Sequence, residues 1–394
     1  MIKRISDTLA YIGTDDLDLD LFESQYIVPE GMAYNSYLLT AGKTAIMDTV
    51  DARKGEEWLA NLDEALGGRT PDFLVVHHME PDHSALIVSV MQRWPSLVLV
   101  ASAKAIAMLP QFFEDFPFAD RCKAVSEGEV LDLGGHELKF FMAPMVHWPE
   151  VMVSLDLETG ALFSADAFDK FGALSKCGYT GEEEQDWVCE ARRYYFNIVG
   201  KYGAPVQSLL KKLPYEAIKA VYPLHGPMLE TNLAYYKGLY DTWSKYEAET
   251  QGVFIACASI HGGTLAAAEK LAEILKAKGA PKVVLGDLTR SDFAENVEDA
   301  FRYPRIVLAA SSYDGSVFTP MHNFLHVLQA KGYCKRKVAL VENGSWAPSA
   351  ARTMRAMLAE MKEIDVVEPV VTIRSRLKAA DVPALEALAD AILA

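Results

Sequence analysis

A short segment in the first half of the chain concentrates side chains that bind metals. Residues 78–83, His-Met-Glu-Pro-Asp-His, place two imidazoles and two carboxylates within six positions. The segment follows the apolar run 73–76, which predicts a buried strand, so the cluster begins where a strand ends. These groups would repel one another or lose hydration at high cost unless a cation neutralised them. The pattern therefore predicts a metal site rather than a solvated, charged turn.

Three further apolar runs in the first half end on a potential metal ligand. The runs 143–146, 161–165 and 220–224 lead into His147, Asp166 and His225. Because strands stacked in a sheet can bring such ends together, we expect these side chains to meet the first cluster. The predicted ligands are His78, Glu80, Asp82, His83, His147, Asp166 and His225.

Seven ligands exceed the needs of one tetrahedral zinc ion and suit two metals that share a carboxylate. Asp166 is the expected bridge, because it is the only carboxylate among the three later ligands. An even division gives one metal His78, Glu80 and His147, and gives the other Asp82, His83 and His225. Each metal then keeps open positions for a substrate. His77 and His136 fit no ligand position and are expected to be structural.

The second half begins with a strand–loop–helix pattern. The apolar run 252–258 is followed by the loop 259–264 and by an amphipathic helix that ends near Gly279. Backbone N–H groups and two hydroxyls at a helix N-terminus suit a phosphate monoester. The loop has neither a lysine after its glycines nor a G-x-G-x-x-G spacing, which argues against a nucleoside triphosphate and a dinucleotide.

Further apolar runs alternate with helical segments up to the C-terminus. They predict five parallel strands in the flavodoxin-like order 2-1-3-4-5. Loops at 311–315 and 343–347 are expected at the same sheet edge, where Tyr313 or Trp346 could stack on an aromatic ring. The expected cofactor-binding residues are Ser259, Ile260, His261, Gly262, Gly263, Thr264, Ser311, Ser312, Tyr313, Asp314, Gly315, Asn343, Gly344, Ser345, Trp346 and Ala347.

Composition is that of an ordinary globular protein, with domains predicted at 1–249 and 250–394. The net charge of -16 argues against nucleic acid as a partner. No run reaches the length of a membrane span, and the N-terminus lacks a signal pattern. The five scattered cysteines give no disulfide framework and no C-x-x-C pair, so a cytoplasmic location is expected.

The pattern H-x-E-x-D-H, followed by single His, Asp and His residues, resembles the metallo-β-lactamase fold. Hydrolases of that fold usually have His at the third motif position and bind zinc, whereas this chain has Glu80. A carboxylate there favours iron. The set resembles the flavodiiron proteins, or A-type flavoproteins. This resemblance implies an α/β chain in which a metallo-β-lactamase-like αββα domain precedes a flavodoxin-like doubly wound parallel sheet. It also implies FMN and a non-haem diiron centre, with variable occupancy at His83.

The resemblance further implies reduction of dioxygen to water, of nitric oxide to nitrous oxide, or both. Electrons would pass through FMN from an external donor, rubredoxin or a similar protein. A head-to-tail homodimer, or a dimer of such dimers, would bring one subunit's FMN to the other's irons. His261 could alter the flavin's potential, and Tyr194, Tyr195 and Trp148 could line the gas pocket. The alternatives are a zinc-dependent hydrolase fused to a flavodoxin-like domain and a non-enzymatic electron carrier.

Overall fold

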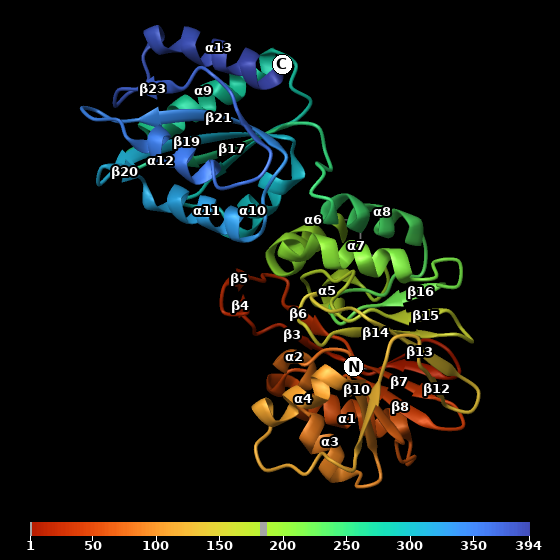
Figure 1. Cartoon of the computed structure of the whole chain (residues 1–394). Helices are drawn as coiled ribbons and strands as arrows, with labels where there is room; N and C mark the ends of the chain where they lie inside the picture. Colours follow the sequence, from red (N-terminus) through yellow and green to blue (C-terminus); the bar gives the residue numbers. More distant parts are fainter. Residues whose placement is uncertain (1, 182–186) are drawn as a thin grey trace. The chain divides into compact units, whose positions relative to one another are not determined.

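The computed structural model describes residues 2–181 and 187–394, and the chain divides into two compact units (Figure 1). The first unit comprises Met1–Tyr195 and Ala204–Asp241. The second comprises Phe196–Gly203 and Thr242–Ala394. The short segment 196–203 thus belongs to the second unit although it interrupts the first in sequence. The domain boundary between residues 249 and 250 stays a prediction.

Two sheets form the centre of the first unit. The first has the order β1 (Lys3–Arg4), β2 (Leu9–Tyr11), β7 (Tyr37–Thr40), β8 (Thr44–Met47), β9 (Phe73–Val75), β10 (Val98–Ser102) and β11 (Cys122–Val125). The second has the order β12 (Val130–Asp132), β13 (Glu137–Met142), β14 (Met152–Asp156), β15 (Ala161–Phe163) and β16 (Ala220–Tyr222). Side chains from both sheets, including Val75 and Phe163, share one apolar core. Burial of these side chains holds the sheets face to face.

Helices cover the outer faces of these sheets. Helices α1 (Gly55–Leu66) and α4 (Ala103–Phe112) contact the first sheet, and α3 (Ile87–Arg93) lies between them in sequence. Figure 1 shows α7 (Gly203–Lys212) and α8 (Leu233–Ser244) beside β15 and β16. The predicted metallo-β-lactamase-like αββα arrangement is confirmed. Two small sheets pair β3 (Thr14–Asp16) with β6 (Met32–Tyr34), and β4 (Leu21–Phe22) with β5 (Tyr26–Ile27).

The second unit contains a parallel sheet with helices on both faces. Its order is β18 (Val283–Asp287), β17 (Val253–Ala258), β19 (Arg305–Tyr313), β21 (Arg336–Asn343) and β22 (Ile364–Val366), and β23 (Val371–Ile373) also pairs with β21. Helices α9 (Gly263–Ala277) and α13 (Val382–Leu393) pack together on one face. Helices α10 (Phe293–Arg302), α11 (Thr319–Ala330) and α12 (Ala350–Leu358) cover the other (Figure 1). The predicted flavodoxin-like order is therefore confirmed.

The continuous apolar sequence of β17 explains why it lies inside this sheet, between β18 and β19. All six residues of the strand are buried, and Val253, Ile255 and Cys257 belong to the core beneath α9 and α13. A strand that is apolar on both faces is stable only where helices cover both.

Among the described residues, no helix is long and apolar enough to cross a lipid bilayer.

Two segments differ from the strand pattern expected from the sequence. The run 143–146 before His147 is not a strand, because β13 ends at Met142. Strand β19 continues through Tyr313 into the region expected to be a loop, since β20 (Ser316–Val317) pairs with it as a tight hairpin. The hairpin turn uses Asp314 and Gly315, both with positive φ, a conformation that glycine adopts without strain.

Candidate metal centre and nucleotide pocket

The ends of three strands deliver most of the predicted ligands to one place. Residues 78–83 follow β9 and lead into the single helical turn α2 (Pro81–Ser84), which starts at a proline tolerated at this first position. Asp166 follows β15, and His225 follows β16. His147 comes from the connection between β13 and β14. The structure brings all seven predicted ligands into two groups that share the Asp166 carboxylate.

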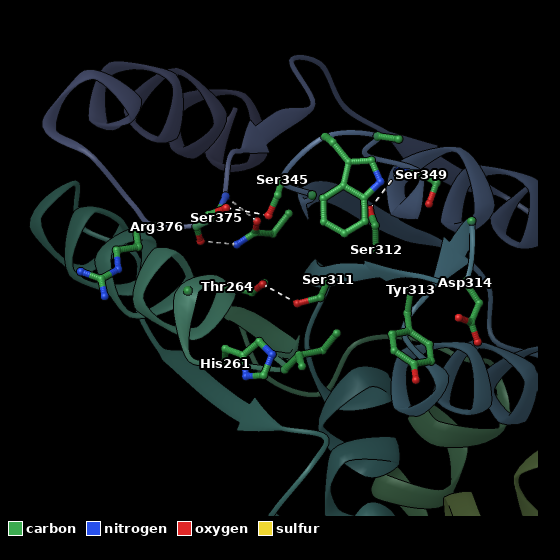
Figure 2. A pocket seen from close by; sticks show the side chains of 17 residues that line it. His261, Thr264, Ser311, Ser312, Tyr313, Asp314, Ser345, Ser349, Ser375 and Arg376 are labelled. Atoms are coloured by element: carbon green, nitrogen blue, oxygen red, sulfur yellow. Dashed lines mark hydrogen bonds between the residues drawn. The ribbon is translucent and has the colours of Figure 1, made fainter.

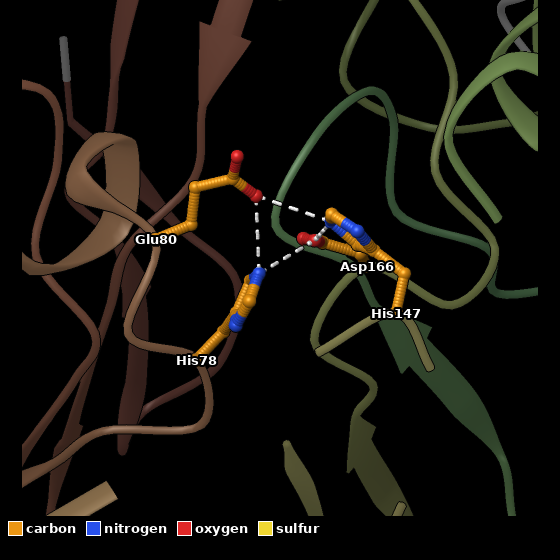
Figure 3. A group of neighbouring side chains, drawn as sticks. All are labelled: His78, Glu80, His147 and Asp166. Atoms are coloured by element: carbon orange, nitrogen blue, oxygen red, sulfur yellow. Dashed lines mark hydrogen bonds and ion pairs between the residues drawn. The ribbon is translucent and has the colours of Figure 1, made fainter. Parts of the chain in front are cut away.

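The first group consists of His78, Glu80, His147 and Asp166. Nε2 of His78 lies 3.1 Å from Oε2 of Glu80 and 3.3 Å from Oδ2 of Asp166. Nε2 of His147 lies 3.1 Å from the same Glu80 oxygen and 3.0 Å from the same Asp166 oxygen. Figure 3 shows the four side chains aimed at a common centre.

The second group consists of Asp82, His83 and His225. Oδ2 of Asp82 lies 3.4 Å from Nε2 of His83 and 3.3 Å from Nε2 of His225. The two imidazole nitrogens are 3.1 Å apart. Oδ1 of Asp166 is 3.4 Å from Nε2 of His83, whereas its Oδ2 contacts the first group. The Asp166 carboxylate thus presents one oxygen to each group.

The spacing of these atoms fits metal coordination better than hydrogen bonding. Ligands that lie about 2.1 Å from a metal, at tetrahedral or octahedral angles, are separated by about 3.0–3.4 Å. Within the described part of the chain, no well-aligned hydrogen bond reaches either oxygen of Asp82 or Asp166, or Nε2 of His147. Buried polar atoms are rarely left without partners, so the donor set fits two cations.

In two of the histidine ligands, the ring nitrogen that faces away from the cluster makes a hydrogen bond that fixes the orientation of the ring. Nδ1–H of His78 donates to Oε1 of Glu150 at 2.8 Å, and the buried Glu150 also accepts the Met79 backbone N–H at 2.9 Å. Nδ1–H of His225 donates to the Ala33 carbonyl at 2.7 Å. Both contacts leave Nε2 directed into the cluster. Such partners set the tautomer of a metal-binding histidine and its basicity.

Without bound metal, the negative carboxylates of the cluster stabilise the protonated form of its histidines. Burial alone would lower the pKa of His147, but contacts with Asp166 and Glu80 raise this pKa to about 9. Burial would raise the pKa of Glu80, yet His147 and His78 hold it well below its usual range. The site therefore balances its carboxylates with positive charge, which metals supply when they displace these protons.

Aromatic rings surround the ligands. The half-buried Trp148 meets the His78 ring edge-on, with centroids 5.2 Å apart. The buried Tyr194 ring lies 5.8 Å from that of His225. Tyr195, named with Tyr194 as a possible neighbour of the site, packs against Tyr240 at 5.1 Å. Tyr194 and Trp148 therefore limit the space around the cluster.

The two histidines expected to be structural have partners outside the cluster. Nδ1 of His77 is 2.5 Å from Oδ2 of Asp48, and Nε2 is 2.7 Å from the hydroxyl of Ser154. Nδ1 of His136 is 2.8 Å from Oδ2 of Asp156. Both imidazoles are buried, so these contacts satisfy ring nitrogens that would otherwise be unpaired.

One acidic residue near the cluster was not predicted from the sequence. Asp169 forms a third close group with Asp166 and His225. It lies three positions beyond Asp166 rather than at a strand end, so the rule that found the other ligands does not select it. Burial and the neighbouring Asp166 carboxylate raise the pKa of Asp169 well above its usual range.

The second unit contains a cavity of about 640 Å³ at the carboxyl edge of its sheet (Figure 2). It is lined by Ile260, His261, Gly263, Thr264, Ser311, Ser312, Tyr313, Asp314, Gly315, Asn343, Gly344, Ser345, Trp346, Ala347, Ser349, Ser375 and Arg376. Ser259 and Gly262, which the sequence reasoning included, do not line it. Ser349, Ser375 and Arg376 were missed. The last two follow β23.

The cavity has the features of a phosphate cradle. Gly263 begins α9, and the Thr264 hydroxyl lies 2.8 Å from that of Ser311. A Cβ atom on Gly263 would come within 2.2 Å of the Ser375 carbonyl oxygen, so this close approach requires glycine. Asn343 fixes the same segment, since its Nδ2–H donates to the Ser375 carbonyl at 2.9 Å. The N–H groups of a long helix then face a cavity lined with hydroxyls, which suits a phosphate.

Two exposed aromatic side chains border the cavity. Trp346 is 88% exposed and Tyr313 is 47% exposed. Rings of this size are seldom left so open unless a ligand or partner covers them. The hydroxyls, the helix N-terminus and the open indole together fit a flavin mononucleotide, which carries one phosphate and a large flat ring.

Comparisons with known proteins agree with this fold and site. Residues 32–226 match the family described as ODP family beta lactamase. The rubredoxin oxygen:oxidoreductase from Desulfovibrio gigas is 22% identical, with a TM-score of 0.91 over 100% of this chain and 98% of that chain. The flavodiiron protein from Giardia intestinalis is 20% identical, with a TM-score of 0.91 over 99% and 96%.

Two sequence relatives extend the comparison. A diflavin flavoprotein A 1 of Nostoc sp. is 28% identical over 374 residues, which are 93% of this chain and 62% of that relative. The chain therefore spans less than two thirds of the relative's length. The anaerobic nitric oxide reductase flavorubredoxin of Vibrio vulnificus is 24% identical over 91% of this chain and 73% of its own.

The fold and the site define a chain that carries a metallo-β-lactamase-like unit with a candidate two-metal centre and a flavodoxin-like unit with a nucleotide pocket. Similarity to relatives that share both units covers nearly the whole chain. Over nearly its whole length the chain is similar to flavodiiron proteins, and the relatives named above include oxidoreductases.

Proposed function

We propose that this chain is a flavodiiron oxidoreductase that reduces dioxygen to water, nitric oxide to nitrous oxide, or both. The observation that carries the proposal is the position of Asp166, which offers one carboxylate oxygen to each of two adjacent ligand groups. A hydrolase needs no electron supply, whereas a flavin-type pocket in the same chain supports a redox role. The names of the Desulfovibrio and Vibrio relatives support both substrates.

In this proposal the seven ligands hold two irons. His78, Glu80 and His147 would bind the first, and Asp82, His83 and His225 the second. Bound iron supplies reversible redox chemistry and open coordination positions for a diatomic gas. Glu80 gives the first position a hard oxygen ligand, which favours iron. Zinc sites of this fold typically have softer, all-nitrogen surroundings.

The surrounding residues hold the ligands in place. Glu150 holds His78, and Ala33 holds His225, so both imidazoles keep Nε2 directed inward. Trp148 and Tyr194 pack on the ligand rings. Rigid placement lowers the reorganisation that a reaction at the site requires.

The cavity of the second unit would hold FMN. The N-terminus of α9, with Thr264 and Ser311, would bind the phosphate, while Tyr313 or Trp346 would contact the ring. Bound FMN accepts and donates electrons singly or in pairs, which links a donor to iron. We further propose rubredoxin or a similar protein as the donor, and a head-to-tail homodimer as the assembly. Light scattering tests the latter, and a monomer at working concentration would contradict it.

Metal analysis joined to gas kinetics tests the proposed function. Two irons per chain, bound FMN, and rapid oxidation of the reduced protein by O2 or NO are the expected results. Two zinc ions with hydrolytic turnover would favour a metal-dependent hydrolase instead. Reducible flavin without gas consumption would leave only an electron carrier.

A further inference from the structure

The carboxylate of Asp169 lies beside Asp166 and His225 and has no well-aligned hydrogen bond within the described part of the chain. Its side chain is fully buried, at 0% exposure. Within residues 2–181 and 187–394 neither of its oxygens receives a well-aligned hydrogen bond, although the Tyr194 side chain and the His225 backbone N–H lie near. Its ligand atom lies within 4.8 Å of those offered by Asp166 and His225. An ionised carboxylate in such surroundings is costly unless a cation compensates it.

The hydrogen bond of His225 decides which of its ring nitrogens is available to a metal. Nδ1–H of His225 donates to the Ala33 carbonyl at 2.7 Å, so Nε2 is the nitrogen available to a metal. This same Nε2 lies 3.3 Å from Asp82 and 3.1 Å from His83. The Asp169 group and the second ligand group therefore share His225, and the ligand atom of Asp169 lies within 4.8 Å of one of its ring nitrogens. A cation bound by the His225 imidazole would therefore lie near both groups.

We propose that Asp169 is an additional ligand of the second metal position. The inference rests on the proposed diiron function and deepens it. The second position would then draw on the carboxylates of Asp82, Asp169 and the shared Asp166. The first draws on Glu80 and Asp166. The two positions would differ in charge by one carboxylate, and the second would favour harder, more highly charged ions.

The Asp169→Asn variant tests this assignment, because it keeps the size of the side chain and removes its charge. The matched control is Asp156→Asn, since Asp156 is also buried but contacts His136 and Thr159. Metal-free forms of both variants and the unmodified chain are titrated anaerobically with Fe(II) by calorimetry. Bound iron is then counted by elemental analysis. Thermal melts of the metal-free proteins separate stability from binding.

The unmodified chain is expected to bind two irons per chain. Asp169→Asn should bind the first with unchanged affinity and the second at least about tenfold more weakly. Without metal, this variant should melt at the same temperature as the unmodified chain or higher, because a repelling carboxylate is gone. Asp156→Asn should bind both irons normally, although its melting temperature should fall.

Three results would overturn the assignment. Wild-type affinity for both irons in Asp169→Asn would make Asp169 a bystander. Instability of this variant without metal would give Asp169 a structural role. An equal loss of the second iron in Asp156→Asn would make the effect non-specific. An unmodified chain that binds fewer than two irons would instead defeat the proposed diiron function itself.

Discussion

Nδ1 of His78 lies 2.8 Å from Oε1 of Glu150, and both side chains are buried. The contact joins a predicted ligand to a carboxylate 72 positions later in the sequence. It directs Nε2 of His78 toward Glu80 and Asp166 and increases the basicity of the ring. Burial would raise the pKa of Glu150, but His78 holds it below its usual range, so the charged form is retained.

Glu150→Gln should therefore weaken metal binding without removing any ligand. A neutral amide polarises the imidazole less, and we expect about 10–100-fold lower affinity at the first position. Competition with a chelator measures this affinity. Glu158→Gln, an exposed site in the same unit, is the control and should bind metal normally. Equal affinities in the two variants would show that Glu150 does not support His78.

Glu80→His should change which metal the first position prefers. The substitution replaces a hard oxygen with a nitrogen, so iron occupancy should fall several-fold relative to zinc. Redox turnover should fall at least about tenfold with it. Growth with both metals, followed by elemental analysis, checks the first effect, and Glu158→His serves as the control. Full iron loading with an unchanged rate would refute the assignment of Glu80.

Gly263→Glu should abolish FMN binding and spare the metals. The new side chain would collide with the Ser375 carbonyl and would place a negative charge at the helix N-terminus. Thr264→Val should weaken binding by about tenfold, since it removes one hydroxyl of the proposed cradle. Flavin absorbance and iron content are measured together. Thr289→Val, whose hydroxyl bonds Asp287 at 2.7 Å, is the control. Loss of both cofactors would mean that the two units do not fold independently.

Asp16→Asn should reduce stability in a pH-dependent way. Burial alone would raise the pKa of Asp16, but Arg53, whose Nε–H donates at 2.7 Å, and the Asp18 N–H hold it below its usual range. A lowered carboxyl pKa stabilises the folded chain above the unfolded pKa, and this contribution disappears as pH falls through the folded value.

We expect a loss of about 1 kcal/mol at pH 7 for this variant, because Arg53 is half exposed and water screens the pair. The loss should shrink below about pH 4. Urea unfolding of the metal-free proteins measures it, with the exposed Asp7→Asn as control. A loss that is constant down to pH 3 would contradict this reading.

The order of the second unit's sheet could be predicted because each strand has a recognisable apolar run in its own sequence. Strand β17 is a continuous apolar run, and the glycine-rich loop after it marks the start of α9. Ser375 and Arg376 could not be predicted in the same way. They line the cavity through pairing of β23 with β21, a long-range contact with no local signature.

The grouping of the seven metal-type side chains also followed from the sequence, since strand ends collect at one edge. His147 was included for the wrong structural reason, because the run before it is a turn after β13 and not a strand. Asp169 and Glu150 could not be found from spacing. Their positions depend on how loops fold back over the cluster, and neither adjoins a strand end that the pattern reveals.

The most direct test is anaerobic rapid mixing of the fully reduced, metal-quantified protein with O2 and, separately, with NO. The account predicts two irons and one FMN per chain, and flavin oxidation that is fast, consumes gas and disappears in Asp166→Asn. Purified protein that binds no iron after reconstitution would contradict the account, as would reduced flavin that survives both gases.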